Sequence, residues 1–234
     1  MNYESFSELN SKLLLLIEDD TRDETHPANL HIKLEKVCAE VISNIGSKVS
    51  LEREPKLEAK PEIVDQLFLK NLDALYFPEK IFQEENYDFK AKALLSEIIS
   101  APNAVSLGDG KSAVPFAELQ QAWKPTKEIE DPVDRFLYVK LFAKMYFGPG
   151  FHHLSLLSGL NHLRTLSILL RLKFKQYLVQ TGQEIDYETA MEYVRSLERR
   201  LTQLDISRES QAVLEVILSS PSRQERLDHF YGQT

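Results

Sequence analysis

The sequence predicts an all-α protein, an irregular multi-helix bundle around a long axial helix at about residues 151–180. Three observations predict this fold class. Glycine is scarce, with 8 in 234 residues. Apolar residues recur at steps of three and four, which is the helical period, and no stretch shows a convincing strand. The hydrophobic content of 43% is that of a globular chain rather than a disordered one.

Two helices are expected at the N-terminal end of the chain, at about residues 7–18 and 28–44. Each carries an apolar stripe, and Gly46 follows the second where a glycine commonly ends a helix. Cys38 lies within the second stripe, where a cysteine behaves as a small buried hydrophobe. The sequence therefore gives this cysteine a packing role.

A linker candidate follows these helices at residues 47–61, a charged stretch with two prolines. The expected division is an N-terminal helical pair at 1–46, the linker at 47–61 and the main helical bundle at 62–234. One continuous domain over 1–234 is the open alternative.

The remaining helices are expected in the main bundle. Its helices are predicted at 63–77, 88–100, 115–123, 132–147, 151–180, 186–204 and 207–218, followed by a short one after Ser220. Pro132 is expected to supply the first turn of its helix, because proline fits the start of a helix. Residues 101–112 form a predicted loop, and Gly148–Gly150 a firm stop.

The helix at 151–180 is predicted to be the axis of the fold. Leucines between Leu154 and Leu172 cover more than one of its faces, and a helix that is apolar over most of its circumference is surrounded by others. Charged residues inside this window argue against a membrane span. The N-terminus lacks the pattern of a signal peptide, so the expected location is cytoplasmic.

Composition excludes several classes of function. The net charge of -8 disfavours nucleic-acid binding, which needs a basic face. A single cysteine excludes an intrachain disulfide and a cysteine-rich metal cluster. We therefore expect no cofactor, no nucleic-acid partner and no membrane partner.

Two motifs with the outline of a functional site are better explained as local structure. The sequence GDGKS at 108–112 lacks the earlier glycine of a phosphate-binding loop, since Val105 stands there. His152, His153 and His162 could suggest a metal, but on one continuous helix they would not face one ion. No metal site is predicted.

Arg164 and Arg171 are the most informative polar residues. They lie seven residues apart on the axial helix, hence on nearly one face, and a buried arginine must be paired to offset desolvation. One interpretation is structural pairing with carboxylates such as Asp134 or Glu192. The other is an anion- or peptide-binding pocket lined by both arginines. Its other candidate residues are His162 and Tyr193.

A family resemblance lies in residues 132–203, about a third of the chain. This stretch contains Arg135-Phe136-Leu137, the leucine-rich run 154–172, and Glu198-Arg199-Arg200. It resembles the helical C-terminal region of flagellin lysine N-methylases and related cysteine-cluster proteins. Those proteins carry an N-terminal cysteine cluster, implied to hold an iron–sulfur centre. This chain lacks the cluster, so the resemblance transfers no catalytic residue.

The leading hypothesis is a non-catalytic helical module that binds another protein or peptide, as an accessory to a cysteine-cluster-type enzyme. The alternative is an enzyme or small-molecule and anion binder with a pocket between helices near Arg164 and Arg171. A homo-oligomeric structural protein is the third hypothesis, whose mark would be concentration-dependent unfolding.

Overall fold

The computed structural model describes residues 62–78, 105–108, 112–120, 126–149 and 151–232, together with Ser11, Leu15 and Leu34. Of these residues, 75% are helical, in seven α-helices with one small two-stranded sheet. The predicted all-α fold class is confirmed. The predicted helices at 7–18, 28–44 and 88–100, the linker at 47–61, and Cys38 lie outside the described residues, so the domain division stays a prediction.

The described elements have the following order along the chain. They are α3 (Ile63–Tyr76), β1 (Ser106–Leu107), β2 (Val114–Pro115), α5 (Phe116–Leu119), α6 (Lys127–Phe142), α7 (Leu156–Thr181), α8 (Tyr187–Gln203), α9 (Arg208–Leu218), α10 (Pro221–Leu227) and the π-helical turn η2 (Asp228–Gly232). None of the helices in the described ranges has the length and apolar character needed to cross a bilayer.

Helix α7 is the structural axis, as predicted. It contacts α3, α5, α6, α8, α9, α10 and η2, and every one of its residues from Ser158 to Gln176 is buried. Leucines on more than one of its faces explain this position, because a helix that is apolar over most of its circumference gains most when neighbours surround it.

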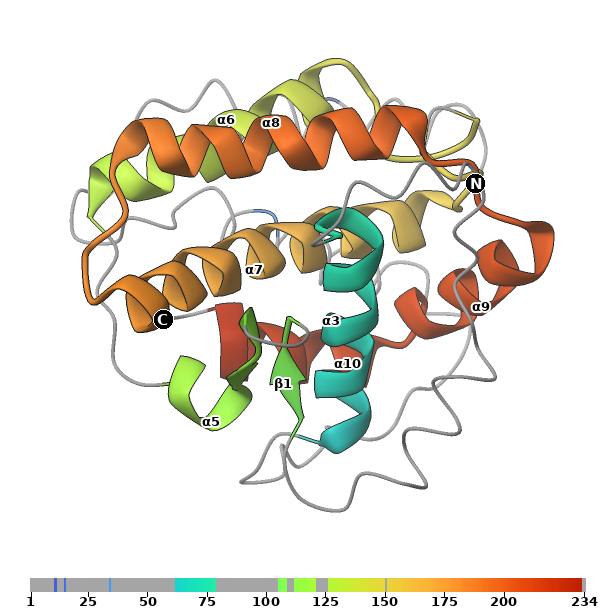
Figure 1. The fold of residues 1–234 in the computed structure, drawn as a ribbon. Coiled ribbons are helices and arrows are strands. Elements are labelled where there is room, and N and C mark those ends of the chain that lie inside the picture. Colours follow the sequence, from blue (N-terminus) through green and yellow to red (C-terminus); the bar gives the residue numbers. More distant parts are fainter. Residues whose placement is uncertain are drawn as a thin grey trace.

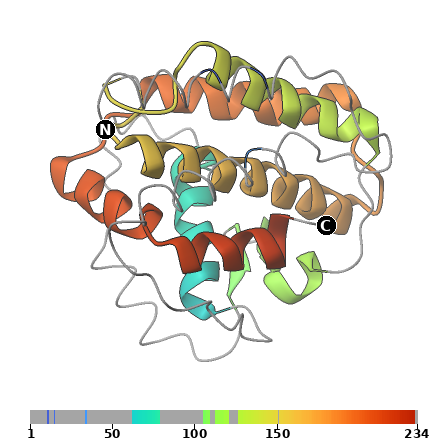
Figure 2. The same ribbon diagram turned by 180° about the vertical axis from the view of Figure 1, so that it is seen from behind.

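The other helices cover α7 from several sides. Helices α6 and α8 lie side by side in one layer, α7 forms the middle, and α5 and α10 lie beyond α7 (Figure 1). Helix α3 runs across the direction of α7 and α10, which is also visible from behind (Figure 2). This arrangement places α7 in contact with segments from both ends of the described chain.

Two predicted helix starts are wrong by about one turn. Helix α6 begins at Lys127, and Pro132 lies inside it. The proline lacks the N–H that would bond the carbonyl of Glu128, and Glu128 is exposed, so water can satisfy that carbonyl. Helix α7 begins at Leu156 rather than at residue 151, since the Ser155 hydroxyl accepts the Ser158 N–H and caps the helix there.

The prediction that no stretch forms a strand was also wrong for two short segments. Strands β1 and β2 pair antiparallel, with Ser106 opposite Pro115 and Leu107 opposite Val114. Two residues per strand are too few for sequence alternation to reveal. The helices α8 and α9, in contrast, begin where predicted, after Asp186 and Ser207, whose side chains cap them.

Two glycines have positions that other residues would strain. Gly182 ends α7 with φ +70, the left-handed conformation that glycine adopts without penalty. Gly159 lies where a Cβ would stand 1.6 Å from the carbonyl oxygen of Tyr146. The start of α7 therefore packs directly against the backbone of the α6–α7 connection.

Candidate functional site

Arg171 forms a buried ion pair with Glu130 of α6. Its Nε lies 2.9 Å and 3.1 Å from the two carboxylate oxygens, and its Nη2 lies 2.7 Å from Oε2. The side chains are 0% and 1% exposed. Burial alone would lower the pKa of Arg171, but the charge and hydrogen bonds of Glu130 raise it, so Arg171 stays charged.

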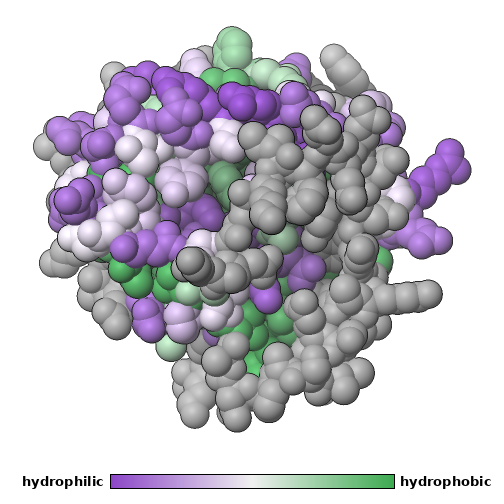
Figure 3. All heavy atoms as spheres, viewed as in Figure 1, coloured by the Kyte–Doolittle hydropathy of each residue, from purple (hydrophilic) through white to green (hydrophobic). Residues whose placement is uncertain are grey.

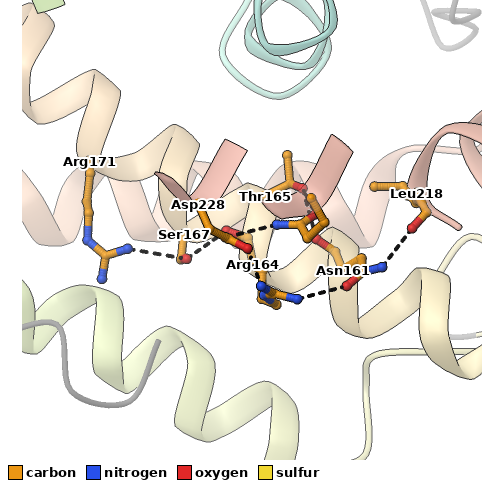
Figure 4. A network of polar contacts seen from close by, with 8 residues as sticks. Asn161, Arg164, Thr165, Ser167, Arg171, Leu218 and Asp228 are labelled. Atoms are coloured by element: carbon orange, nitrogen blue, oxygen red, sulfur yellow. Dashed lines mark hydrogen bonds and ion pairs between the residues drawn. The ribbon is translucent and has the colours of Figure 1, made fainter. Parts of the chain in front are cut away.

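Arg164 is the centre of a second buried cluster, between α7 and the C-terminal segment. Its Nη2 donates to the carboxylate of Asp228 and its Nη1 donates to Asn161, 3.2 Å away. Asn161 in turn donates to the carbonyl of Leu218, at 2.8 Å. Figure 4 shows these groups converging from α7, the end of α9 and η2.

Ser167 connects the two clusters. It lies between the arginines on α7, donates to the Arg164 carbonyl at 2.8 Å and is 3.5 Å from Nη1 of Arg171. A continuous polar stripe thus runs along the axial helix inside an otherwise apolar core (Figure 4). The guanidinium groups of Arg164 and Arg171 are already bound to carboxylates, and these pairs join α7 to neighbouring segments.

The predicted carboxylate partners were near but not correct. Asp134 lies one turn from Glu130 and contributes only through its charge to the attraction on Arg171. Glu192 is exposed and binds Arg195 of its own helix at 2.7 Å. Sequence reasoning missed Glu130 and Asp228, although Glu130 stands three residues before the buried Val133, on the inner face of α6.

Further buried pairs tie α3 to the rest of the bundle. Lys173 of α7 lies 3.0 Å from Asp73, and Asp65 accepts from both Arg223 and Arg226 of α10. Ion pairs of this kind fix which helix faces which, since leaving one partner buried alone is costly.

His162 lies apart from the arginines, in a cluster with Tyr76 of α3 and His152. The Tyr76 hydroxyl is 2.9 Å from Nε2 of His162 and 3.2 Å from Nε2 of His152. The phenol has one proton, so it donates to one imidazole and accepts from the other. Tyr76 could not be found from the sequence, because it lies 86 residues from His162.

Burial keeps this cluster neutral. It lowers the pKa of His152 to about 4, against the opposing attraction of Asp205. It also lowers the pKa of His162 well below its usual range, with His152 adding to the effect. Burial raises the pKa of Tyr76, and Arg200 offsets a part of that rise.

The two adjacent histidines lie in a strained turn and not on α7. His152 and His153 have φ +53 and +54, a left-handed backbone that costs a non-glycine residue on the order of 1–2 kcal/mol. Only His152 is buried, while His153 is exposed. The strained turn aims His152 at Tyr76, so the premise of one continuous helix was wrong.

Tyr193, the fourth predicted site residue, packs elsewhere. Its ring lies edge-on to Phe77 at 6.0 Å and tilted to Phe174 at 6.1 Å. No hydrogen bond within the described ranges joins it to His162, Arg164 or Arg171. The structure thus brings the two arginines onto one stripe and leaves His162 and Tyr193 in separate places. Ligand binding by these four residues stays a prediction.

The loop at 108–112 is described in part, at Gly108 and Ser112. The Ser112 carbonyl accepts from Gln176 at 2.7 Å. Among the described residues, no group of three or more His, Cys, Asp or Glu side chains is arranged to hold a metal ion.

An exposed apolar stripe lies on the outer face of α6 and the turn after it. It consists of Tyr138, Val139, Phe142 and Met145, with Phe142 62% exposed. Tyr138 and Phe142 stack with their ring planes 5° apart. Apolar atoms reach the surface along the edge of the molecule where α6 and this turn lie (Figure 3). We call this set the α6 stripe.

The α6 stripe is not needed for packing within the described bundle. The inner face of α6 has its own buried apolar set, namely Val133, Phe136, Leu137 and Leu141. On the outer face, residues 138 and 142 follow the spacing that a helix uses to bind a groove, and residue 145 of the following turn extends their apolar surface. Exposed apolar groups in such a row are typical of a binding surface.

The fold and these sites define a helical-bundle protein built on one buried helix and joined by interhelical ion pairs. Comparison of the chain with protein-family models, with curated proteins and with solved structures gave no match. The resemblance to the cysteine-cluster proteins therefore stays a prediction.

Proposed function

We propose that this chain is a non-catalytic helical module that binds another protein through the α6 stripe. The observation that carries the proposal is the set Tyr138, Phe142 and Met145, exposed along the end of a helix whose inner face is already packed and on the turn after it. Apolar anchors at this spacing are how an amphipathic helix recognises a groove or a second helix.

The charge around the α6 stripe adds a preference for the partner. From residue 135 to residue 147 the chain has three cations and no carboxylate. Arg135 is paired with Asp131 at 2.6 Å and Lys140 is buried near Glu198, while Lys144 is exposed beside Met145. A partner with an acidic residue beside its apolar anchors would attract Lys144, whereas residues 135–147 of a second copy offer no carboxylate. This favours a different protein over a homo-oligomer.

The resemblance of residues 132–203 to cysteine-cluster proteins supplies the first candidate partner. This segment includes α6, α7 and α8, so the α6 stripe falls inside it. An accessory role beside a protein that carries the cysteine cluster is consistent with a chain that itself has a single cysteine.

Site-specific photo-crosslinking tests this proposal. A photoreactive amino acid replaces Phe142 in one sample and Val216, an isolated apolar residue that is 72% exposed, in the matched control. We expect a crosslinked protein from the native lysate at position 142 only, and its loss when Val139→Asp is added. Equal capture from both positions, or none from position 142, would contradict the proposal.

The alternative function, anion binding between helices at Arg164 and Arg171, has less support. An anion would have to compete with Asp228 and Glu130 for guanidinium groups that these carboxylates already occupy. Native mass spectrometry of the chain purified from its own cells distinguishes the two functions. A co-purifying small anion that Arg164→Met removes would favour the pocket.

A further inference from the structure

The cluster of Tyr76, His152 and His162 has a feature that core packing does not require. Three potential metal donors lie close together, one phenolic oxygen and two imidazole nitrogens. The oxygen lies 3.2 Å and 2.9 Å from the two Nε2 atoms, and the centres of the two imidazole rings lie 6.1 Å apart. Zinc binds such donors at roughly 2.0–2.1 Å, so that neighbouring ligands of one ion lie roughly 2.9–3.4 Å apart. Both oxygen–nitrogen separations fall in this range, and the two imidazoles would move toward each other as the ion binds.

We propose that Tyr76, His152 and His162 form a binding site for one divalent first-row transition-metal ion, such as Zn²⁺ or Cu²⁺. Imidazole nitrogen suits both ions. Three protein ligands would leave a fourth coordination position for water, as in zinc sites that are not purely structural. This site is independent of the α6 stripe.

The backbone around His152 is a second observation in favour of the site. The chain holds both His152 and His153 in a left-handed conformation, although a glycine or an asparagine would adopt it at lower cost. Strained backbone of this kind concentrates at functional sites. Here the strain has a visible result, since it turns the His152 imidazole inward onto Tyr76 and leaves His153 at the surface.

The surroundings allow an ion to enter and to bind. His152 belongs to the short turn between α6 and α7, next to the exposed His153, so a local opening of this turn gives access. Phe151 stands edge-on to His162 at 5.2 Å and shields the donors from water. Asp205 adds a negative charge near His152, which offsets part of the charge of an ion.

The protonation states follow from the geometry. Each imidazole presents the Nε2 lone pair when its proton is on Nδ1, and Nδ1 of His162 has no hydrogen-bond partner among the described residues. Binding breaks the Tyr76 O–H bond, forms the metal–oxygen bond and releases the proton to solvent. Affinity therefore rises with pH. Because metal-bound histidines are strengthened by an acceptor at the other nitrogen, we expect a site of moderate affinity.

Metal titration of the full chain tests the proposal with two matched variants. His152→Asn and His153→Asn replace neighbouring residues of the same left-handed conformation, which asparagine tolerates. Only the first removes a proposed ligand. Binding of Zn²⁺ is measured by calorimetry after EDTA treatment, together with the melting temperature of each variant with and without Zn²⁺.

We expect one Zn²⁺ per chain for the wild type and for His153→Asn, with a rise in melting temperature, and binding weaker by about 100-fold or more in His152→Asn. With Cu²⁺, a phenolate-to-copper absorption band should appear and should be absent in Tyr76→Phe. No binding by the wild type would overturn the proposal. Equal affinity of both asparagine variants would do so as well, because it would place the ion on surface histidines.

Discussion

Replacing Arg171 by methionine is expected to destabilise the protein by about 3–5 kcal/mol, the usual cost of leaving one charge of a buried pair alone. Three contacts of 2.7 to 3.1 Å between Arg171 and Glu130 would be lost. The carboxylate of Glu130, 1% exposed, would then remain without its cation. A domain is stable by only about 5–15 kcal/mol, so the effect should be large.

The assay is urea denaturation followed by circular dichroism, with the free energy of unfolding extrapolated to water. Arg195→Met is the matched control, because Arg195 makes a contact of 2.7 Å with Glu192 while its side chain is 48% exposed. Exposed pairs contribute roughly 0–1 kcal/mol. If the two variants lose similar stability, the assignment of Arg171 as a structural residue is refuted.

Three further changes test other parts of the structure. Gly159→Ala should destabilise by about 3 kcal/mol or more in a melting experiment, because its Cβ would meet the Tyr146 carbonyl at 1.6 Å. Ser207→Ala should cost about 1 kcal/mol through loss of the α9 cap, whereas Ser220→Ala, at a position without a side-chain cap bond, should cost little. In metal-free protein, stability should fall by at least about 3 kcal/mol as the pH falls from about 6.5 toward 4, because the unfolded chain protonates His152 and His162 more readily; unchanged urea midpoints over this range would contradict that assignment.

Patterns within single elements predicted the fold class well. The leucine-rich window placed α7 at the centre, and Asp186, Ser207 and Gly182 marked helix ends that the structure has. The start of α7 was misplaced because Phe151 continues the apolar pattern. Ser155, a capping residue type just before the helix, was the overlooked signal.

For contacts between distant segments, the sequence predicted the type of partner but not the particular residue. An arginine at position 171 of a buried helix had to have a carboxylate partner. The predicted partner Asp134 lies on the correct helix, α6, but the residue that pairs with Arg171 is Glu130. The choice of Glu130 depends on how α6 is rotated against α7, which local periodicity does not determine. Tyr76 and His152 had no sequence signal in common, because a strained turn and a crossing helix bring them together.

The rotation of α7 is itself a consequence of these polar residues. Leucines on all sides give α7 no preferred face, so apolar packing alone leaves its orientation poorly defined. We infer that the buried pairs with Glu130 and Asp228 select one orientation, a role attested for buried polar groups in some helical proteins. Arg171→Met combined with Glu130→Leu should then recover much of the stability lost by Arg171→Met alone, yet broaden the amide signals of α7 in NMR spectra. Sharp, dispersed signals in that variant would mean that shape complementarity of the apolar residues suffices.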